Sequence, residues 1–129
     1  MPAYVQDLMS RPVETVAAET QIRDAAADAL AHDVGALVVV DDADRLEGLL
    51  TATDVVRLAA DGVHPADAIV GEWMRTDLIT TEPDTAVTEA AEAMLEHRVH
   101  HVPVVDDGAV VGMLTSLDLA AAYGRSAGN

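Results

Sequence analysis

The 129-residue chain contains no cysteine, no lysine and no phenylalanine, and only one tryptophan and two tyrosines. The absence of cysteine excludes disulfide bonds, zinc sites built on thiolates and cysteine nucleophiles. The absence of lysine excludes the glycine-rich phosphate loop of nucleotide hydrolases, which requires that residue. The core must therefore be built from Val, Leu, Ala, Ile and Met. No apolar run approaches the roughly 20 residues that span a bilayer and no signal peptide opens the chain, so we expect a cytoplasmic protein without membrane contact.

Positive charge is scarce as well. Seven basic residues, all of them arginines, stand against 23 acidic ones, which gives a net charge of −16. Acid spread in this way keeps a protein soluble when salt screens its self-repulsion, and we interpret it as adaptation to a cytoplasm of molar salt, as in halophiles. An acidic surface for binding a partner is the alternative. Nucleic acid is not expected as a partner, because no basic stripe is present to replace counterions.

The most informative feature that the chain does have is a long internal repeat. Three segments return 65 residues later: Val5–Met9 as Val70–Met74, Thr20–Ala26 as Thr85–Ala91, and His32–Asp41 as His97–Asp106. Gly48–Asp54 returns as Gly112–Asp118 at an offset of 64, so the second copy lacks one residue in the intervening turn. Two copies of this length indicate a pair of related modules rather than a solenoid. We expect repeats at 5–60 and 70–123, joined by a linker at 61–69.

Hydrophobic patterning predicts the same five elements in each copy. In the first copy we expect strands at 13–16, 36–40 and 46–50, the last two as a hairpin, and helices beginning after Thr20 and at Thr51. The apolar face of the first helix comprises Ile22, Ala25, Ala26, Ala29 and Leu30, and Gly35 marks its end. In the second copy we expect strands at 78–81, 102–105 and 110–114, and helices capped by Thr85 and beginning at Thr115. Each copy is thus β-α-β-β-α, in the mixed α/β class.

The two junctions between the last strand and the last helix carry the candidate chemistry. Thr51-Ala-Thr-Asp54 and Thr115-Ser-Leu-Asp118 occupy equivalent positions. The first N–H groups of a helix have no partner within it, so such an end attracts phosphate, a Thr hydroxyl can donate to an anion, and a carboxylate can accept from ribose hydroxyls. The same spacing also suits reciprocal capping of the helix, with Asp in place of Glu. Capping and ligand binding are compatible.

The order of elements, the Val-Pro-Val-Val-Asp strand ending at Asp106 and the Gly-x-x-Thr-x-x-Asp motif opening a helix resemble the CBS domain. Two in tandem resemble a CBS pair, or Bateman module, and the resemblance covers residues 5–123. It implies two β-α-β-β-α repeats packed sheet to sheet about a pseudo-twofold axis, with clefts that bind AMP, ADP, ATP or S-adenosylmethionine. It also implies a stand-alone sensor without catalytic residues, a homodimer, and an unknown effector protein that receives the signal. The helices expected to form the dimer carry Val55, Val56, Leu58 and Ala59, and Leu119 to Ala122.

By the same resemblance each site combines residues of both copies. Thr51, Thr53 and Asp54 would face Ile79, Thr80, His100, His101 and Val102, while Thr115, Ser116 and Asp118 would face Glu14, Thr15, Gly35, Ala36 and Leu37. His100 and His101 can donate to phosphates, whereas Gly35 and Ala36 offer no side-chain donor. We therefore expect the Asp54 site to be the stronger phosphate site, and the Asp118 site to prefer an uncharged nucleoside or to stay empty.

Other interpretations remain open. His97, His100 and His101 could bind a metal, although His97 matches His32 of the first copy and suggests a shared structural role; we expect no metal site. Arg57 and Arg98 are either phosphate partners or exposed members of surface ion pairs. No nucleophile elbow or metalloproteinase signature is present, so an enzyme is not expected. The alternative function is a protein–protein adaptor with vestigial clefts.

Overall fold

The computed structural model describes residues 4–127, with side chains described as far as Gly124. The chain divides into two compact units. One comprises Glu14–Leu78, and we call it the first-repeat unit. The other joins the residues up to Val13 to those from Ile79 onward, and we call it the second-repeat unit. The bounds of the units differ from those of the sequence copies. The residues that begin the first copy belong to the second-repeat unit, and those that begin the second copy belong to the first-repeat unit.

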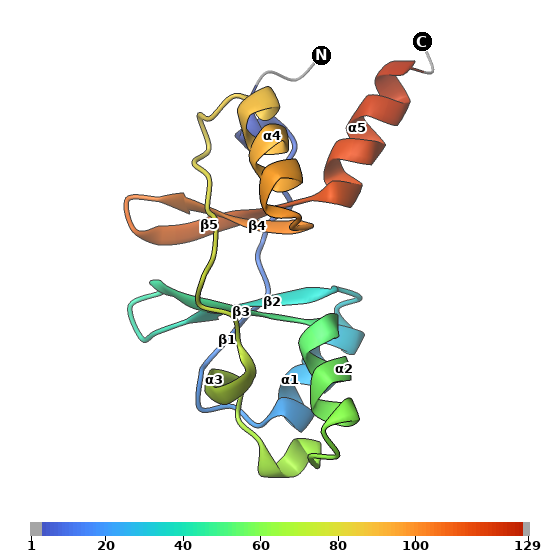
Figure 1. Ribbon diagram of the computed structural model, residues 1–129. Helices are drawn as coiled ribbons and strands as arrows, with labels where there is room; N and C mark the ends of the chain where they lie inside the picture. Colours follow the sequence, from blue (N-terminus) through green and yellow to red (C-terminus); the bar gives the residue numbers. More distant parts are fainter. Residues whose placement is uncertain (1–3, 128–129) are drawn as a thin grey trace. The chain divides into compact units, whose positions relative to one another are not determined.

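The first-repeat unit is built on a three-stranded sheet. Its strands are β1 (Thr15–Val16), β2 (Ala36–Val40) and β3 (Leu46–Thr51), in the order β1-β2-β3, with β1 parallel and β3 antiparallel to β2. Helices α1 (Ile22–Ala31) and α2 (Ala52–Ala60) lie on one side of this sheet (Figure 1). The short helices η2 (Pro65–Asp67) and α3 (Val70–Trp73) follow. The predicted hairpin is confirmed, but α1 is capped at Gln21 rather than Thr20 and ends at Ala31, before Gly35.

The second-repeat unit repeats this plan with a smaller sheet. It contains η1 (Val5–Asp7), α4 (Val87–His97), the antiparallel strands β4 (His101–Asp106) and β5 (Ala109–Thr115), and α5 (Ser116–Ala127). Helix α4 is capped at Ala86 rather than at the predicted Thr85. Asp107 and Gly108 form a two-residue turn with positive φ values of 52° and 85°, as hairpins of this length require. Because this turn is so short, the second copy has one residue fewer here than the first. No helix in the described part of the chain is long and apolar enough to cross a bilayer.

The strand predicted at 78–81 is wrong. Only Thr81 pairs, in a single parallel bridge to Val104. In the first-repeat unit, Val38 N donates to Glu14 O at 3.0 Å and so extends β1 along β2. The residue equivalent to Val38 is Pro103, which has no N–H to donate. The second copy therefore loses the hydrogen bond that would lengthen its first strand.

The segment that begins each copy packs on the other copy. Val5 N donates to Thr85 O at 2.9 Å, and Val70 N donates to Thr20 O at 2.8 Å. Val5 and Val70 have no exposed surface, and each belongs to the core of the unit that it joins. The expected linker is also part of a unit, because Ala68 O accepts a 2.9 Å bond from the first turn of α1. The two copies are thus interlocked along the chain rather than arranged as successive domains.

The apolar faces of the helices are narrower than their sequence patterns predict. Ile22 and Ala25 are fully buried in α1, but Leu30 is 83% exposed, and its equivalent Leu95 in α4 is 81% exposed. Of the residues expected on the dimer surface, Leu58 and Ala122 are buried within their own units, so they are not available for a partner.

The exchanged segments lie so close to the sheets that glycine is required beneath them. A Cβ added to Gly48 would lie 2.6 Å from Met74 Sδ and 2.8 Å from the carbonyl oxygen of Arg75. At the equivalent Gly112 it would lie 2.6 Å from Met9 Sδ and 3.3 Å from Ser10 O. Contacts this short force backbone or side chains to move.

We therefore predict that Gly48→Ala lowers the free energy of unfolding by about 1–3 kcal/mol, because the added methyl overpacks the contact with the Met74–Arg75 segment. Gly124→Ala is the matched control. Gly124 lies in α5 with nothing within 4 Å of an added Cβ, and replacing a helical glycine should stabilise by up to about 1 kcal/mol. Urea denaturation in molar KCl measures both. An unchanged Gly48→Ala midpoint would contradict the close packing.

Candidate functional site

The junction between β3 and α2 is organised around the carboxylate of Asp54, which is only 1% exposed. Its Oδ2 accepts hydrogen bonds from Thr51 N at 2.8 Å and from Thr51 Oγ1 at 3.0 Å. In return, Asp54 N donates to Thr51 Oγ1 at 3.4 Å. This is the capping box considered for this spacing. Because the Thr51 hydroxyl proton is already directed to Asp54, it is not free to donate to an anion in this geometry.

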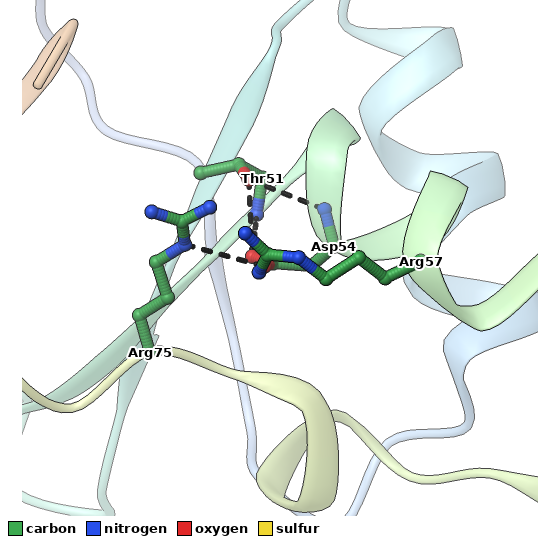
Figure 2. Close-up of polar contacts among 4 residues, drawn as sticks. All are labelled: Thr51, Asp54, Arg57 and Arg75. Atoms are coloured by element: carbon green, nitrogen blue, oxygen red, sulfur yellow. Dashed lines mark hydrogen bonds and ion pairs between the residues drawn. The ribbon is translucent and has the colours of Figure 1, made fainter. Parts of the chain in front are cut away.

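The other oxygen of the same carboxylate is held by two arginines. Arg57 Nη1 donates to Asp54 Oδ1 at 3.0 Å, and Arg75 Nε donates to it at 3.2 Å (Figure 2). Arg57 comes from α2 itself, one turn further on. Arg75 follows α3 and pairs its backbone with Leu49 of β3. The four donors match the roughly four acceptor positions of a carboxylate, so Asp54 must exchange one of them to accept a ribose hydroxyl.

Arg57 is therefore more than a member of a surface ion pair. Its side chain is 58% exposed, but its partner is buried. Leaving a buried carboxylate without partners is costly, and the two arginines are the donors that its Oδ1 receives. Arg75, whose side chain is 41% exposed, is the member of this network that the sequence analysis missed. It lies 21 residues from Asp54 along the chain, and only its position in the exchanged segment brings it there.

The equivalent junction in the second-repeat unit has the same cap without the arginines. Asp118 Oδ2 accepts from Thr115 N at 2.9 Å, and Asp118 N donates to Thr115 Oγ1 at 3.1 Å. Its Oδ1 accepts from Ser10 Oγ at 2.9 Å. Ser10 takes the place of Arg75, and Ala121 that of Arg57. Asp118 is half-buried and receives two donors where Asp54 receives four, which leaves it able to accept further hydroxyl groups.

The loop before each hairpin is tied to the junction of its own unit. Ala52 N donates to Gly35 O at 3.1 Å, and Ser116 N donates to His100 O at 3.0 Å. The hairpin register places Ala36 and Leu37 opposite Thr51 and Leu50, and His101 and Val102 opposite Thr115 and Leu114. Of the remaining predicted residues, Thr15 pairs with Val38 in β1, and Thr53 is exposed on α2. Each unit therefore brings its junction and its loop together.

A cavity of about 520 Å³ in the second-repeat unit contains Ile79, Thr80 and Val102 in its wall. Glu82, Glu89 and Asp107 line the same cavity. Three carboxylates make this region unfavourable for phosphates and compatible with uncharged or cationic groups. Thr81 also contributes to the wall, and its buried Oγ1 has no hydrogen-bond partner within the described residues.

His32, His97 and His100 make two kinds of side-chain contact. His32 Nδ1 lies 2.9 Å from Asp28 O and His97 Nδ1 lies 3.0 Å from Ala93 O, so both rings contact the preceding turn of their helices. This shared contact agrees with a structural role for His97. His100 instead contacts Ser116 Oγ at 3.0 Å through Nδ1. No group of three or more potential metal ligands gathers anywhere in the described residues.

A known protein family matches each of the two copies separately. The CBS domain matches at residues 5–61 and again at 70–125, which together form most of the chain. The chain belongs to the CBS domain family. It is 34% identical over 116 residues to hypoxic response protein 1 of Mycobacterium tuberculosis, across 89% of this chain and 81% of that protein.

Solved CBS pairs have the same fold. The CBS domain pair of protein MJ0100, in complex with 5′-methylthioadenosine and S-adenosylmethionine, superposes with a TM-score of 0.89 at 31% identity. The match covers 97% of this chain and 99% of that one. Hypoxic response protein I, solved with two coordinated zinc ions, superposes with a TM-score of 0.81 at 33% identity, over 92% and 97% of the two chains. The mixed α/β fold class and the tandem CBS architecture are thereby confirmed.

His101 makes stability depend on pH. Burial lowers its pKa below the ordinary value of 6.5, neighbouring His100 lowers it further, and Asp118 partly opposes both. The unfolded chain therefore binds the proton more readily than the folded one. The stability contributed by neutral His101 is present above pH 6.5 and is lost as pH falls through its lower folded pKa.

We predict that the melting temperature falls between about pH 7 and pH 5 and that His101→Gln flattens this dependence, because the substitution removes the titrating group. His64→Gln, which replaces an exposed histidine in the same way, is the control for the substitution itself. Differential scanning calorimetry across this range measures the effect. Equal slopes in wild type and His101→Gln would contradict the assignment.

Proposed function

We propose that this chain is a regulatory module that binds an adenosine-containing ligand, namely AMP, ADP, ATP or S-adenosylmethionine, and signals to a separate effector protein. The observation that supports it best is the pair of Thr-x-x-Asp junctions at equivalent positions of a CBS pair fold. The similar MJ0100 pair binds 5′-methylthioadenosine and S-adenosylmethionine, which are both adenosine compounds.

The residues that we propose to contact ligand lie at the two junctions, in the loops before the hairpins and along the first strands. They are Thr51, Thr53, Asp54, Ile79, Thr80, His100, His101, Val102, Thr115, Ser116, Asp118, Thr15, Gly35, Ala36 and Leu37. Asp118 is the best ribose acceptor among them, since its carboxylate receives two donors and has capacity for more. Apolar side chains of this set would contact the flat faces of the base.

The module acts by binding rather than by catalysis. The carboxylates of Asp54 and Asp118 are used for capping the two helices, and that of Asp54 also for ion pairs with Arg57 and Arg75. Binding can signal only if the ligand has different affinities for two arrangements of the module. We propose that the output passes to a protein that reads this difference.

A thermal-shift screen tests ligand binding. Wild type should melt several degrees higher with AMP, ATP or S-adenosylmethionine, because a ligand at 100 times its Kd stabilises by about 2.7 kcal/mol. The screen is run in molar KCl, since the net charge of −16 predicts that salt is needed for stability. Asp118→Ala should reduce the shift given by adenosine, and Asp54→Ala the shift given by AMP.

Each variant is compared with its own melting temperature without ligand, so that a change in stability is not mistaken for a change in binding. If no adenosine compound raised the melting temperature of wild type, the sensor function would be rejected. The chain would then be better described as a protein–protein adaptor with vestigial clefts.

We also propose that the chain is a homodimer. Each unit has an apolar pocket beside its first helix, and the two pockets are lined by equivalent residues, including Leu30 and Val55 in one and Leu95 and Leu119 in the other. Leu30 and Leu95 are more than 80% exposed. A second copy of the chain offers the same exposed leucines, and an isologous contact between two copies would bury them against apolar surface.

Leu30→Glu combined with Leu95→Glu should convert the dimer to a monomer, because a dimer interface would bury these charges. Light scattering after gel filtration should give twice the 13.5 kDa chain mass for wild type and the single mass for the variant. Ile69→Glu changes an exposed apolar residue outside both pockets and serves as the control. A monomeric wild type would refute the dimer.

A further inference from the structure

The Asp54 network carries more positive charge than the carboxylate needs. Arg57 and Arg75 both bind Oδ1 of Asp54, so two guanidinium groups surround one negative charge. Within the described part of the chain, no second carboxylate lies at salt-bridge distance from either arginine. One positive charge remains uncompensated at this point of a chain whose net charge is −16.

The arginines also retain unused hydrogen-bond donors. Arg57 uses Nη1 and Arg75 uses Nε to bind Asp54. The other guanidinium nitrogens make no hydrogen bond to the residues that the structure describes. The side chains are 58% and 41% exposed, so these donors are open to a ligand from solution. Two planar guanidinium groups held near one another can donate several N–H bonds to the oxygens of a phosphate group.

We propose that Arg57 and Arg75 form a binding site for a phosphate group, and that Asp54 positions the two guanidinium groups. This inference rests on the proposed function and deepens it, because it assigns a phosphorylated nucleotide to the first-repeat unit. Asp54 is then a positioning residue through its Oδ1, and it would contact a ribose only by exchanging one of its four donors. S-adenosylmethionine, which is cationic at its sulfur, is the wrong ligand for this site.

The second-repeat unit indicates that the arginines are not needed for capping. Asp118 forms the same reciprocal bonds with Thr115, although Ser10 and Ala121 occupy the two arginine positions. The arginine pair is therefore an addition to the common junction. The pair also gives the two units different preferences for ligand charge, since Asp118 of the second-repeat unit has no cationic partner within the described residues.

The competing explanation is that the arginines only stabilise the buried charge of Asp54. In that case their removal would lower stability without changing the preference for phosphorylated ligands. The two explanations differ in one ratio, the Kd for adenosine divided by the Kd for AMP. A purely structural role would not change this ratio.

Titration calorimetry at constant ionic strength measures the ratio on the full chain. Arg75→Ser and Arg57→Ala are made singly, because each introduces the equivalent residue of the second-repeat unit and leaves Asp54 one cationic partner. Arg45→Gln, an exposed arginine in the hairpin turn of the same copy, controls for the loss of one positive charge. Broadening of the ³¹P signal of inorganic phosphate gives a second measurement that does not require adenosine binding.

We expect wild type to prefer AMP over adenosine by about 100-fold, and each arginine substitution to reduce this preference about tenfold, the effect of losing one charge-assisted hydrogen bond. Arg45→Gln should keep the wild-type ratio. Inorganic phosphate should be broadened by wild type and by Arg45→Gln, and much less by the two site variants.

If AMP and adenosine bound equally well, or if neither site variant changed the ratio, the phosphate site would be rejected while the proposed function stood. If no adenosine compound bound but phosphate broadening required Arg57 and Arg75, the proposed function would fail and the phosphate site would stand. If neither nucleotides nor phosphate bound, both would be rejected.

Discussion

A carboxylate that is withdrawn from water must receive hydrogen bonds from the protein, and this requirement organises the first-repeat unit. Asp54 is 1% exposed and is held by one backbone N–H, one hydroxyl and two guanidinium groups. These donors come from the end of β3, from α2 and from the segment that follows α3. One buried charge therefore fixes the turn from strand to helix and also fastens the exchanged segment to the sheet. Asp54, at the N-terminus of α2, therefore also joins segments that are distant in the sequence.

The two copies show how the same backbone can support different chemistry. Their caps, hairpin registers and exchanged segments correspond, and both place a methionine over a glycine of the last strand. The difference lies in the side chains around the carboxylate: two arginines surround Asp54, whereas a serine donates to Asp118. Because the cap holds each carboxylate in the same place, a substitution nearby changes its charge environment without changing its position.

Much of the local structure follows from the sequence, because hairpins and caps depend on residues close together in the chain. The pairing of β2 with β3 and the cap at Thr51 are of this kind. The exchange of segments could not be predicted, since equivalent residues in two copies satisfy the same contacts whichever copy they pack on. Arg75 was missed for that reason. The exposure of Leu30 could not be predicted either, because helical periodicity marks an apolar face without saying what covers it.

The position of Arg75 bears on how the binding of an anion at this site is transmitted to the rest of the chain. Its backbone pairs with Leu49, and the chain leaves the first-repeat unit three residues later, after Leu78. A phosphate that binds the Arg75 side chain therefore acts on the last fixed point before the chain enters the second-repeat unit. The equivalent Ser10 lies three residues before Val13, where the chain passes in the other direction. A ligand can shift an equilibrium only through contacts that differ between two states. Contacts at these two crossing points are suited to that role, because a change there is transmitted along the chain itself and requires no separate pathway.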